Sequence, residues 1–115
     1  MSLSGAHRAA FRREVPQDGS VFTIRDKRGY PIPKDPDGCR AVPFWSKASR
    51  ARKVIDQVSA YRRFEVVAID VADWRERWLP GLHREGHLVG INWSGTRATG
   101  YDMTPAEVMR WFAGS

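Results

Sequence analysis

The chain has 115 residues and a hydrophobic fraction of 42%, which suits one folded domain and argues against two. No apolar run approaches the roughly 20 residues that a membrane-spanning helix needs, and no signal peptide is expected, so no membrane partner is predicted. The single cysteine, Cys39, excludes an internal disulfide and favours a cytoplasmic location, where thiols stay reduced.

The formal net charge of +6 is spread unevenly along the chain. Residues 1–63 carry 14 Lys and Arg against 6 Asp and Glu, whereas residues 64–115 carry 5 against 7. Such an asymmetry is found in proteins with an anionic partner, although a solvated basic surface produces the same pattern. Nucleic acid is therefore an open alternative rather than the favoured partner.

The N-terminal region is expected to hold a short helix. Residues 1–5 are assigned to a disordered or cloning-derived tail, and residues 6–115 to a single domain. The helix runs from Ala6 to Val15, and Pro16 is expected to end it because the residue before a proline avoids the α region.

The next segment predicts a hairpin followed by a further strand. The run VFTIR, residues 21–25, is β-branched and aromatic, and Asp26–Gly29 has the composition of a hairpin loop. Tyr30–Pro33 is expected to return as an edge strand, since its two prolines cannot donate to a ladder. A loop at residues 34–38 then leads to a strand at residues 40–45.

Ser46 is expected to cap a helix that extends from Lys47 to Ala60. The apolar residues of this helix recur at helical spacing, which produces one buried stripe. The stripe consists of Ala48, Ala51, Val54, Ile55 and Val58.

The following region predicts a strand and a tryptophan-rich helix. The strand, residues 64–69, contains the run VVAI, which suggests burial on both of its faces. Asp70 can cap the helix, and Pro80 should kink it or end its regular turns. Gly86 fits the left-handed position that closes a helix. The apolar side of this helix carries Val71, Trp74, Trp78 and Leu82.

Residues 88–93 predict a further strand with alternating faces. Val89, Ile91 and Trp93 are expected to face one way. Gly90, on the other face, leaves room for a helix or another backbone to come close.

Residues 104–107, TPAE, carry the clearest local signal of the chain. Thr104 and Glu107 can form a reciprocal capping box, and Pro105 fits the first helical position. The order of elements indicates an α+β domain, with a small mixed sheet of four to five strands and three to four helices packed on it.

An ordered series of segments resembles a known bacterial family. The segments VFTIRDKRGY, VPFWS, FEVVAID, WLPGL, GHLVGINW and GYDMTPAE occur in this order between about Phe11 and Phe112. Together they resemble domain of unknown function family 2750, and a more distant likeness is to the N-terminal part of SseB-like proteins. The family resemblance implies a soluble, single-domain bacterial protein and supplies no catalytic or binding residue.

The sequence carries no recognisable catalytic, cofactor or metal signature, so no cofactor or metal is predicted. His83 and His87 are four residues apart, but Gly86 between them should end the helix, and surface histidines are the simpler interpretation. The acidic residues near a helix start fit capping and the helix dipole better than acid–base chemistry. These acidic residues are Asp70, Asp73 and Glu76.

Two sets of residues are candidates for binding. Candidates for contact with a partner are Trp45, Trp93 and Arg75. Rings at strand ends can line a groove, and exposed tryptophans often anchor a partner. A guanidinium on an apolar helix face requires a carboxylate or an aromatic ring to interact with. A basic patch with Tyr61 among its members is a candidate for phosphate contact. The patch consists of Arg50, Arg52, Lys53, Arg62 and Arg63.

These observations favour a non-enzymatic cytoplasmic interaction module that binds another protein. Weak nucleic-acid binding through the basic N-terminal half is the first alternative, since phosphate contacts need cations of this kind. An enzyme with a dispersed, unrecognised site is the second alternative. No oligomeric state is predicted.

Overall fold

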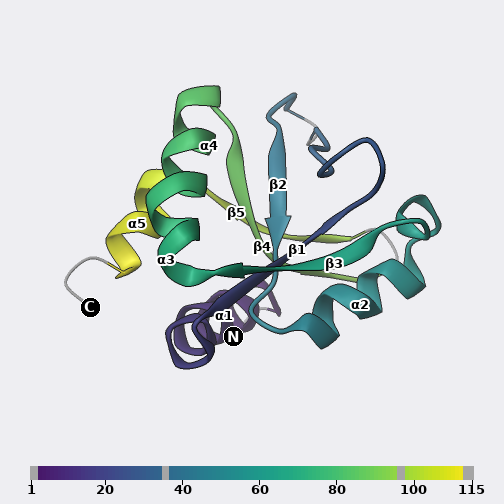
Figure 1. Cartoon of the computed structure of the whole chain (residues 1–115), viewed down its shortest axis with the longest axis horizontal. Coiled ribbons are helices and arrows are strands. Elements are labelled where there is room, and N and C mark those ends of the chain that lie inside the picture. Colours follow the sequence, from purple (N-terminus) through teal and green to yellow (C-terminus); the bar gives the residue numbers. More distant parts are fainter. Residues whose placement is uncertain (1–2, 35–36, 96–97, 113–115) are drawn as a thin grey trace.

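The computed structural model describes residues 3–34, 37–95 and 98–112, and it confirms the predicted α+β class (Figure 1). The predicted loop at residues 34–38 therefore lies partly outside the described residues. The elements in chain order are α1 (Leu3–Asp18), β1 (Ser20–Arg25), β2 (Ala41–Phe44), α2 (Ala48–Gln57), a 3-10 turn (Ser59–Tyr61), β3 (Glu65–Asp70), α3 (Val71–Asp73), a π-helical turn (Trp74–Trp78), α4 (Leu79–Glu85), β4 (Leu88–Ser94), β5 (Thr99–Met103) and α5 (Pro105–Phe112). In these ranges no helix combines the length and the apolar character that crossing a membrane requires.

The strands of the described residues form two sheets. β1 and β3 pair antiparallel, with Ser20 opposite Asp70 at one end of the ladder. β4 is the centre of the second sheet, with β2 parallel on one side and β5 antiparallel on the other. Phe22 and Trp45 join the two sheets by a pair of backbone hydrogen bonds of 2.8 and 2.7 Å.

Helices cover the strands from several sides and create two cores. In Figure 1, α1 lies below the strands, α3, α4 and α5 lie at the left, and α2 lies at the lower right. The larger core joins α1, α4 and α5 to the strands and includes Phe11, Leu79 and Val108. The smaller core joins α2 to the strands and includes Val54 and Trp93.

α1 is longer than predicted at both ends. It begins at Leu3, inside the expected tail, and it continues past Pro16 to Asp18. Gly19, with a φ of 71°, ends the helix and donates its N–H to the carbonyl of Val15 over 2.9 Å. Pro16 is tolerated because it lies exposed in the last turn, where the carbonyl that loses its partner can bond to water.

The predicted returning strand at Tyr30–Pro33 is wrong, because β1 pairs with β3 instead. The expected turn at Asp26–Gly29 does form, closed by two backbone hydrogen bonds of 3.0 and 3.1 Å between its end residues. Residues 30–33 follow an irregular path, since their two prolines lack ladder donors. Tyr30 packs edge-on against Trp78 instead, with ring centroids 4.9 Å apart.

Two strands differ from the prediction: β3 is less buried than expected, and β5 was not expected at all. β3 is buried only at Ile69 and is exposed at Glu65, Ala68 and Asp70, so the expected burial on both faces is wrong. β3 has only β1 as a paired neighbour among the described strands, which leaves it at an edge. β5 was not predicted, because its sequence TGYDM contains glycine and aspartate, which are depleted in strands.

A bulge in β4 reverses the expected facing of Trp93. The pairing with β5 shifts between Ile91 and Ser94, and Asn92 adopts a φ of 45°. Trp93 therefore packs in the smaller core, whereas Ile91 lies in the larger one. Gly90 makes room for the Trp93 indole rather than for a helix or backbone: a Cβ at Gly90 would lie 2.5 Å from that ring.

The helical run over residues 71–85 contains a π-helical turn, Trp74–Trp78, directly before Pro80. The wider turn interrupts the α-helical pattern where the proline lacks its N–H, as predicted. Asp70 caps the run by accepting the N–H of residue 72 at 3.1 Å. Gly86 closes it with a φ of 70°. Both predicted helix ends are thus confirmed.

α5 begins with the predicted capping box. Thr104 Oγ1 accepts the N–H of Glu107 at 3.2 Å, and Glu107 Oε1 accepts the N–H of Thr104 at 3.0 Å. The bond from the Thr104 N–H, followed by the one from its hydroxyl, holds the pKa of Glu107 below its ordinary value. The stabilising contribution of Glu107 is therefore present above its unfolded-state pKa and is lost as the pH falls through its lower folded-state pKa.

Removing this cap should destabilise the domain. Thr104→Ala is expected to lower the free energy of unfolding by about 1 kcal/mol, because the N–H of Glu107 loses its acceptor. Thr104→Ser keeps the hydroxyl and should stay within about 0.5 kcal/mol of the parent protein. Urea unfolding followed by circular dichroism measures both. An alanine variant with the parent's midpoint would show that the start of α5 does not depend on the cap.

Candidate partner-binding groove

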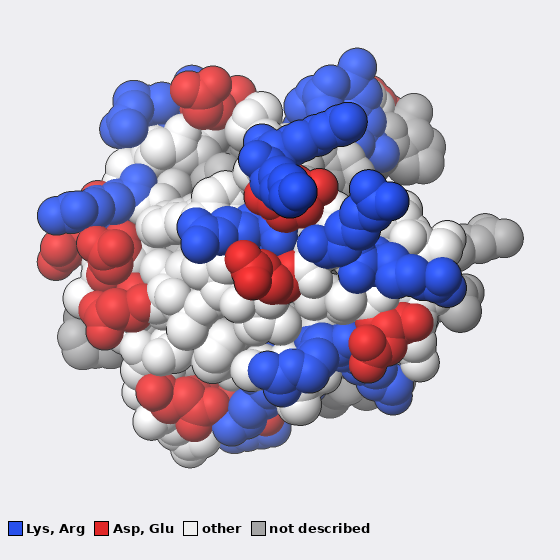
Figure 2. Space-filling model, turned by 45° about the vertical axis from the view of Figure 1, so that its right-hand side comes forward, with Lys and Arg blue, Asp and Glu red and all other residues white. Residues whose placement is uncertain are grey.

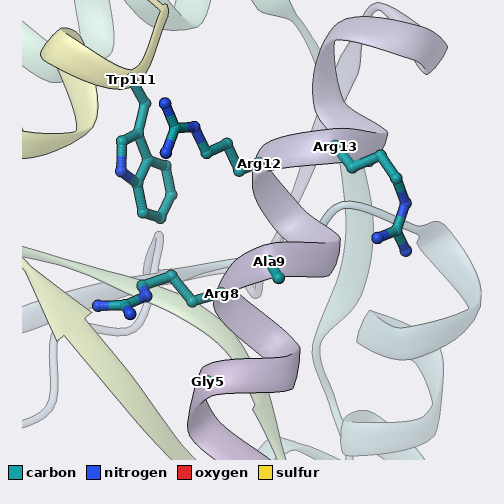
Figure 3. Close-up of a pocket in the computed structure, with 6 residues that line it drawn as sticks. All are labelled: Gly5, Arg8, Ala9, Arg12, Arg13 and Trp111. Carbon is teal, nitrogen blue, oxygen red and sulfur yellow. The ribbon is translucent and has the colours of Figure 1, made fainter. Parts of the chain in front are cut away.

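The main candidate site is a groove between α1 and the last turn of α5. It encloses about 630 Å³. Its lining residues are Gly5, Arg8, Ala9, Arg12, Arg13 and Trp111 (Figure 3). Arg8 and Arg12 extend on the side of Trp111, whereas Arg13 projects away from it (Figure 3). We call this surface the arginine groove.

The spacing of residues on α1 produces the arginine groove. Arg8 and Arg12 are four residues apart, and positions i and i+4 lie on one helix face. Gly5 and Ala9 occupy the same side with little or no side chain, which leaves the floor hollow. Trp111, only partly buried, forms the opposite wall from α5.

Aromatic rings hold both arginines in place. The guanidinium carbon of Arg8 lies 4.9 Å from the centre of the Tyr101 ring, and that of Arg12 lies 5.7 Å from the Trp111 ring. Each cation–π contact is worth about 0.5–1 kcal/mol at an exposed site. Neither arginine takes part in the ion pairs that the described residues form. Two positive charges are thus positioned in a concave surface, and the nearby Glu107, whose pKa the Arg8 charge helps to lower, offsets one of them only from a distance.

A second polar feature is a buried cluster around Asn92, at the bulge of β4. Asn92 Oδ1 accepts the N–H of Ser46 at 2.9 Å, and its Nδ2 donates to the carbonyl of His7 at 3.2 Å and to Ser46 Oγ at 3.0 Å. Ser46 Oγ also bonds to Glu14 Oε1 at 2.7 Å. This Asn92 cluster ties α1, the exit of β2 and β4 together.

Ser46 belongs to the Asn92 cluster, so its predicted role as a helix cap is wrong. Lys47 is the N-terminal flanking residue of α2, and it makes no side-chain capping bond. Ser46 is fully buried, and its hydroxyl is occupied by cluster partners instead of an α2 backbone N–H.

Glu14 and Arg50 complete the Asn92 cluster as a charged pair. Arg50 Nη1 contacts Glu14 Oε1, and Arg50 Nη2 lies 3.3 Å from Oε2. The hydrogen bond from Arg50, helped by the one from Ser46 and opposed by burial, holds the pKa of Glu14 below its ordinary value. Glu14 therefore stays charged at neutral pH and satisfies Arg50 within the fold.

The predicted partner contacts at Trp45, Trp93 and Arg75 are occupied inside the molecule. Trp45 is 0% exposed and donates its Nε1–H to the carbonyl of Trp93 at 2.8 Å. Trp93 is 6% exposed and donates to Asp102 Oδ1 at 2.9 Å. Arg75 Nη2 donates to the carbonyl of Phe112 at 2.8 Å, which satisfies the end of α5. The exposure that would make Trp45 a surface anchor is therefore absent.

The predicted phosphate-binding residues lie on α2 and directly after the 3-10 turn. Arg50 turns toward Glu14, whereas Arg52 and Lys53 are exposed on α2 and Arg62 and Arg63 are exposed beyond the 3-10 turn. Arg63 lines a cavity of about 690 Å³ together with Asp26, Lys27 and Arg28. On the side of the molecule that Figure 2 displays, Lys and Arg gather at the upper right, with carboxylates between them. Phosphate contact through these five residues stays a prediction, in which Arg50 is already paired with Glu14.

The residues considered for metal binding or acid–base chemistry lie at a helix end, in a helix cap or in a surface ion pair. Gly86 separates His83 from His87 with left-handed backbone, so the two histidines do not share a regular helix face. Asp70 caps its helix, and Asp73 lies 3.2 Å from Arg77. In the described ranges, no three His, Cys, Asp or Glu side chains gather as metal ligands would.

Sequence reasoning missed the arginine groove and the Asn92 cluster. Arg8 and Arg12 show an i, i+4 spacing that could have been noticed, but Trp111 lies about a hundred residues further along the chain. Asn92 stands within a strand pattern and gives no local sign of its positive φ. Only the folded chain brings these residues to their partners.

The fold and the groove define a small α+β domain with a basic and aromatic surface. The chain belongs to the family described as protein of unknown function (DUF2750), whose family model matches residues 8–111, and this confirms the predicted family. The likeness to SseB-like proteins stays a prediction. No curated protein matches the chain.

One solved structure is similar in its backbone path. It is Anabaena Tic22 (protein transport), with a TM-score of 0.44 and 10% sequence identity. The similarity covers 78% of this chain and 46% of the Tic22 chain, so this chain spans less than half the length of that protein. At this TM-score the likeness carries no argument about function.

Proposed function

We propose that the chain is a non-enzymatic interaction module that holds an acidic segment of a partner protein in the arginine groove. The observation that carries the proposal is the pair Arg8 and Arg12, which are positioned by aromatic rings and take part in none of the ion pairs of the described residues. Positive groups fixed in a concave surface attract and orient an anionic partner.

The partner is an acidic peptide segment because the groove combines charge with an aromatic wall. Trp111 offers apolar area beside Arg12, which suits a leucine or phenylalanine next to a carboxylate. Guanidinium groups bind carboxylates in a forked, two-bond geometry. The single Cys39 supports a cytoplasmic setting, and the family resemblance supports a bacterial one.

The proposal is tested with a defined peptide probe. A fluorescein-labelled twelve-residue peptide with four glutamates and two leucines should bind with a Kd in the micromolar range in fluorescence anisotropy, and the affinity should fall as salt increases. The same peptide with glutamines in place of the glutamates should bind at least about tenfold more weakly. A labelled oligothymidine of twelve nucleotides is titrated in parallel.

Variants locate the binding surface. The double variant Arg8→Glu, Arg12→Glu should weaken binding of the glutamate peptide by about tenfold or more, since both attractive charges become repulsive. The control is Arg84→Glu, which makes the same charge change at an exposed residue of α4. It should alter the affinity less than threefold. Equal binding of both peptides, or tighter binding of the oligothymidine, would contradict the proposal and favour the nucleic-acid alternative.

A further inference from the structure

A second cavity lies on the other side of α1, where α1, α2 and the end of β4 meet. It encloses about 420 Å³, within the range of small-molecule sites. Its polar and aromatic lining includes His7, Arg50, Lys53, Asn92, Trp93 and Gly95. We call it the β4-end cavity. It shares no lining residue with the arginine groove.

The charges around the β4-end cavity are positive. Arg50 and Lys53 line it, and no Asp or Glu does. Arg50 is already bonded to Glu14, so its charge is largely neutralised within the Asn92 cluster. Lys53 is exposed and takes no part in the ion pairs of the described residues, which leaves its ammonium group for an anion.

His7 also lines the β4-end cavity. Its Nδ1 is buried and has no hydrogen-bond partner among the described residues, whereas its backbone carbonyl is held by Asn92 Nδ2. A buried polar atom without a partner costs about 1–3 kcal/mol, and because protein atoms enclose this nitrogen, it is a cost to the fold and not a contact for a ligand. The Asn92 cluster fixes the backbone of His7 in its place at this cavity.

An apolar wall completes the β4-end cavity. Val54, 2% exposed, and Trp93 line it on the sides of α2 and β4. Val54 and Trp93 are 2% and 6% exposed, so a ring or short alkyl group would cover only the small edge that each presents to the cavity. A concave site with an apolar wall and a few polar groups is the usual form of a small-molecule site.

We propose that the β4-end cavity binds a small organic anion, a carboxylate or a phosphate monoester with an aromatic or aliphatic group attached. The anionic group bonds to Lys53 beside His7, and the apolar group rests against the edges of Val54 and Trp93 that line the cavity. This site goes beyond the proposed function, because it requires no residue of the arginine groove.

The test uses phenyl phosphate and benzoate as probes, with neutral benzamide as the matched control. Two-dimensional NMR of the labelled protein should show saturable shifts for the Gly95 amide and the Trp93 indole N–H with at least one anion, at a Kd below about 1 mM. Benzamide should bind at least tenfold more weakly. Preference for phenyl phosphate over benzoate, or the reverse, identifies the anionic group.

Adjacent exposed residues on α2 provide a matched pair of variants. Lys53→Met removes the proposed ammonium contact and should weaken anion binding at least fivefold, whereas Arg52→Met removes a neighbouring charge outside the cavity and should change it less than twofold. The groove double variant Arg8→Glu, Arg12→Glu should retain binding.

Several outcomes would overturn the proposal. These are no saturable shift up to 10 mM of either anion, equal weakening by Lys53→Met and Arg52→Met, and shifts that map to Trp111 instead of Trp93. None of them bears on peptide binding in the arginine groove, which is measured separately, so the two proposals fail independently.

Discussion

Replacing Trp74 by alanine is expected to lower the free energy of unfolding by about 3–5 kcal/mol, because it removes a large buried ring. Trp74 is 0% exposed and stands at the centre of an aromatic cluster. Its ring centroid lies 5.8 Å from that of Phe11, 5.4 Å from that of Phe44 and 6.1 Å from that of Phe112. One side chain thus joins the helical run to α1, β2 and α5, and its removal leaves a cavity bordered by all of them.

Phenylalanine at position 74 separates the contribution of ring packing from the cost of the unpaired indole N–H. The Trp74 Nε1–H is buried and has no hydrogen-bond partner among the described residues, which costs about 1–3 kcal/mol. Trp74→Phe removes that donor while it keeps most of the ring contacts. The cost of the smaller cavity and the relief of the unpaired N–H should offset one another, so we expect a change within about 1 kcal/mol.

Urea unfolding followed by far-ultraviolet circular dichroism measures both Trp74 variants, because removing a tryptophan also changes the fluorescence signal. Trp111→Ala is the control: this ring is only partly buried, and its removal should cost about 1 kcal/mol. A loss below 1 kcal/mol for Trp74→Ala, or a loss equal to that of Trp111→Ala, would show that the aromatic cluster does not hold the helices to the sheet.

The elements that could be predicted are those whose cause is local. The capping box at Thr104, the cap at Asp70 and the left-handed closure at Gly86 depend on residues within one helical turn, and all three are present. Strand pairing does not have a local cause, because β1 pairs with β3, which lies about forty residues further along the chain. A sequence pattern gives no preference for that partner over the adjacent residues 30–33, and the hairpin prediction failed for this reason.

The candidate sites were harder to predict than the helix ends. Arg50 was correctly noticed as a cation, but its partner Glu14 lies 36 residues earlier in the chain. Trp93 was expected to face the same way as Ile91, and a single left-handed residue between them reverses this. Charge and aromatic content are visible in a sequence. Tertiary packing decides which charged residues pair with one another and which aromatic rings stay at the surface.

Replacing Asn92 by alanine is the second large prediction, with an expected loss of about 3 kcal/mol in the free energy of unfolding. The variant leaves the N–H of Ser46 and the carbonyl of His7 without their side-chain partner in a buried site. It also forces alanine into a φ of 45°, where asparagine is tolerated better than other residues with a Cβ.

Glycine at position 92 separates the two costs. Asn92→Gly removes the same hydrogen bonds but adopts a positive φ without strain, so it should be about 1 kcal/mol more stable than Asn92→Ala. Urea titrations of both variants, read by circular dichroism, give the difference. Identical stabilities would show that the backbone conformation costs nothing, and a loss below 1 kcal/mol for Asn92→Ala would contradict the structural role of the cluster.

A double-variant cycle with Ser46→Ala then tests whether the Asn92 cluster acts as a unit. Asn92 makes hydrogen bonds to both the N–H and the hydroxyl of Ser46, and the hydroxyl also bonds to Glu14. Residues that share a network show coupling energies of about 0.5–3 kcal/mol, whereas distant residues add independently. We expect the Asn92→Gly, Ser46→Ala double variant to lose less stability than the sum of the single losses. The second substitution removes a bond that the first has already broken, so strict additivity would mean that the two side chains stabilise the fold separately.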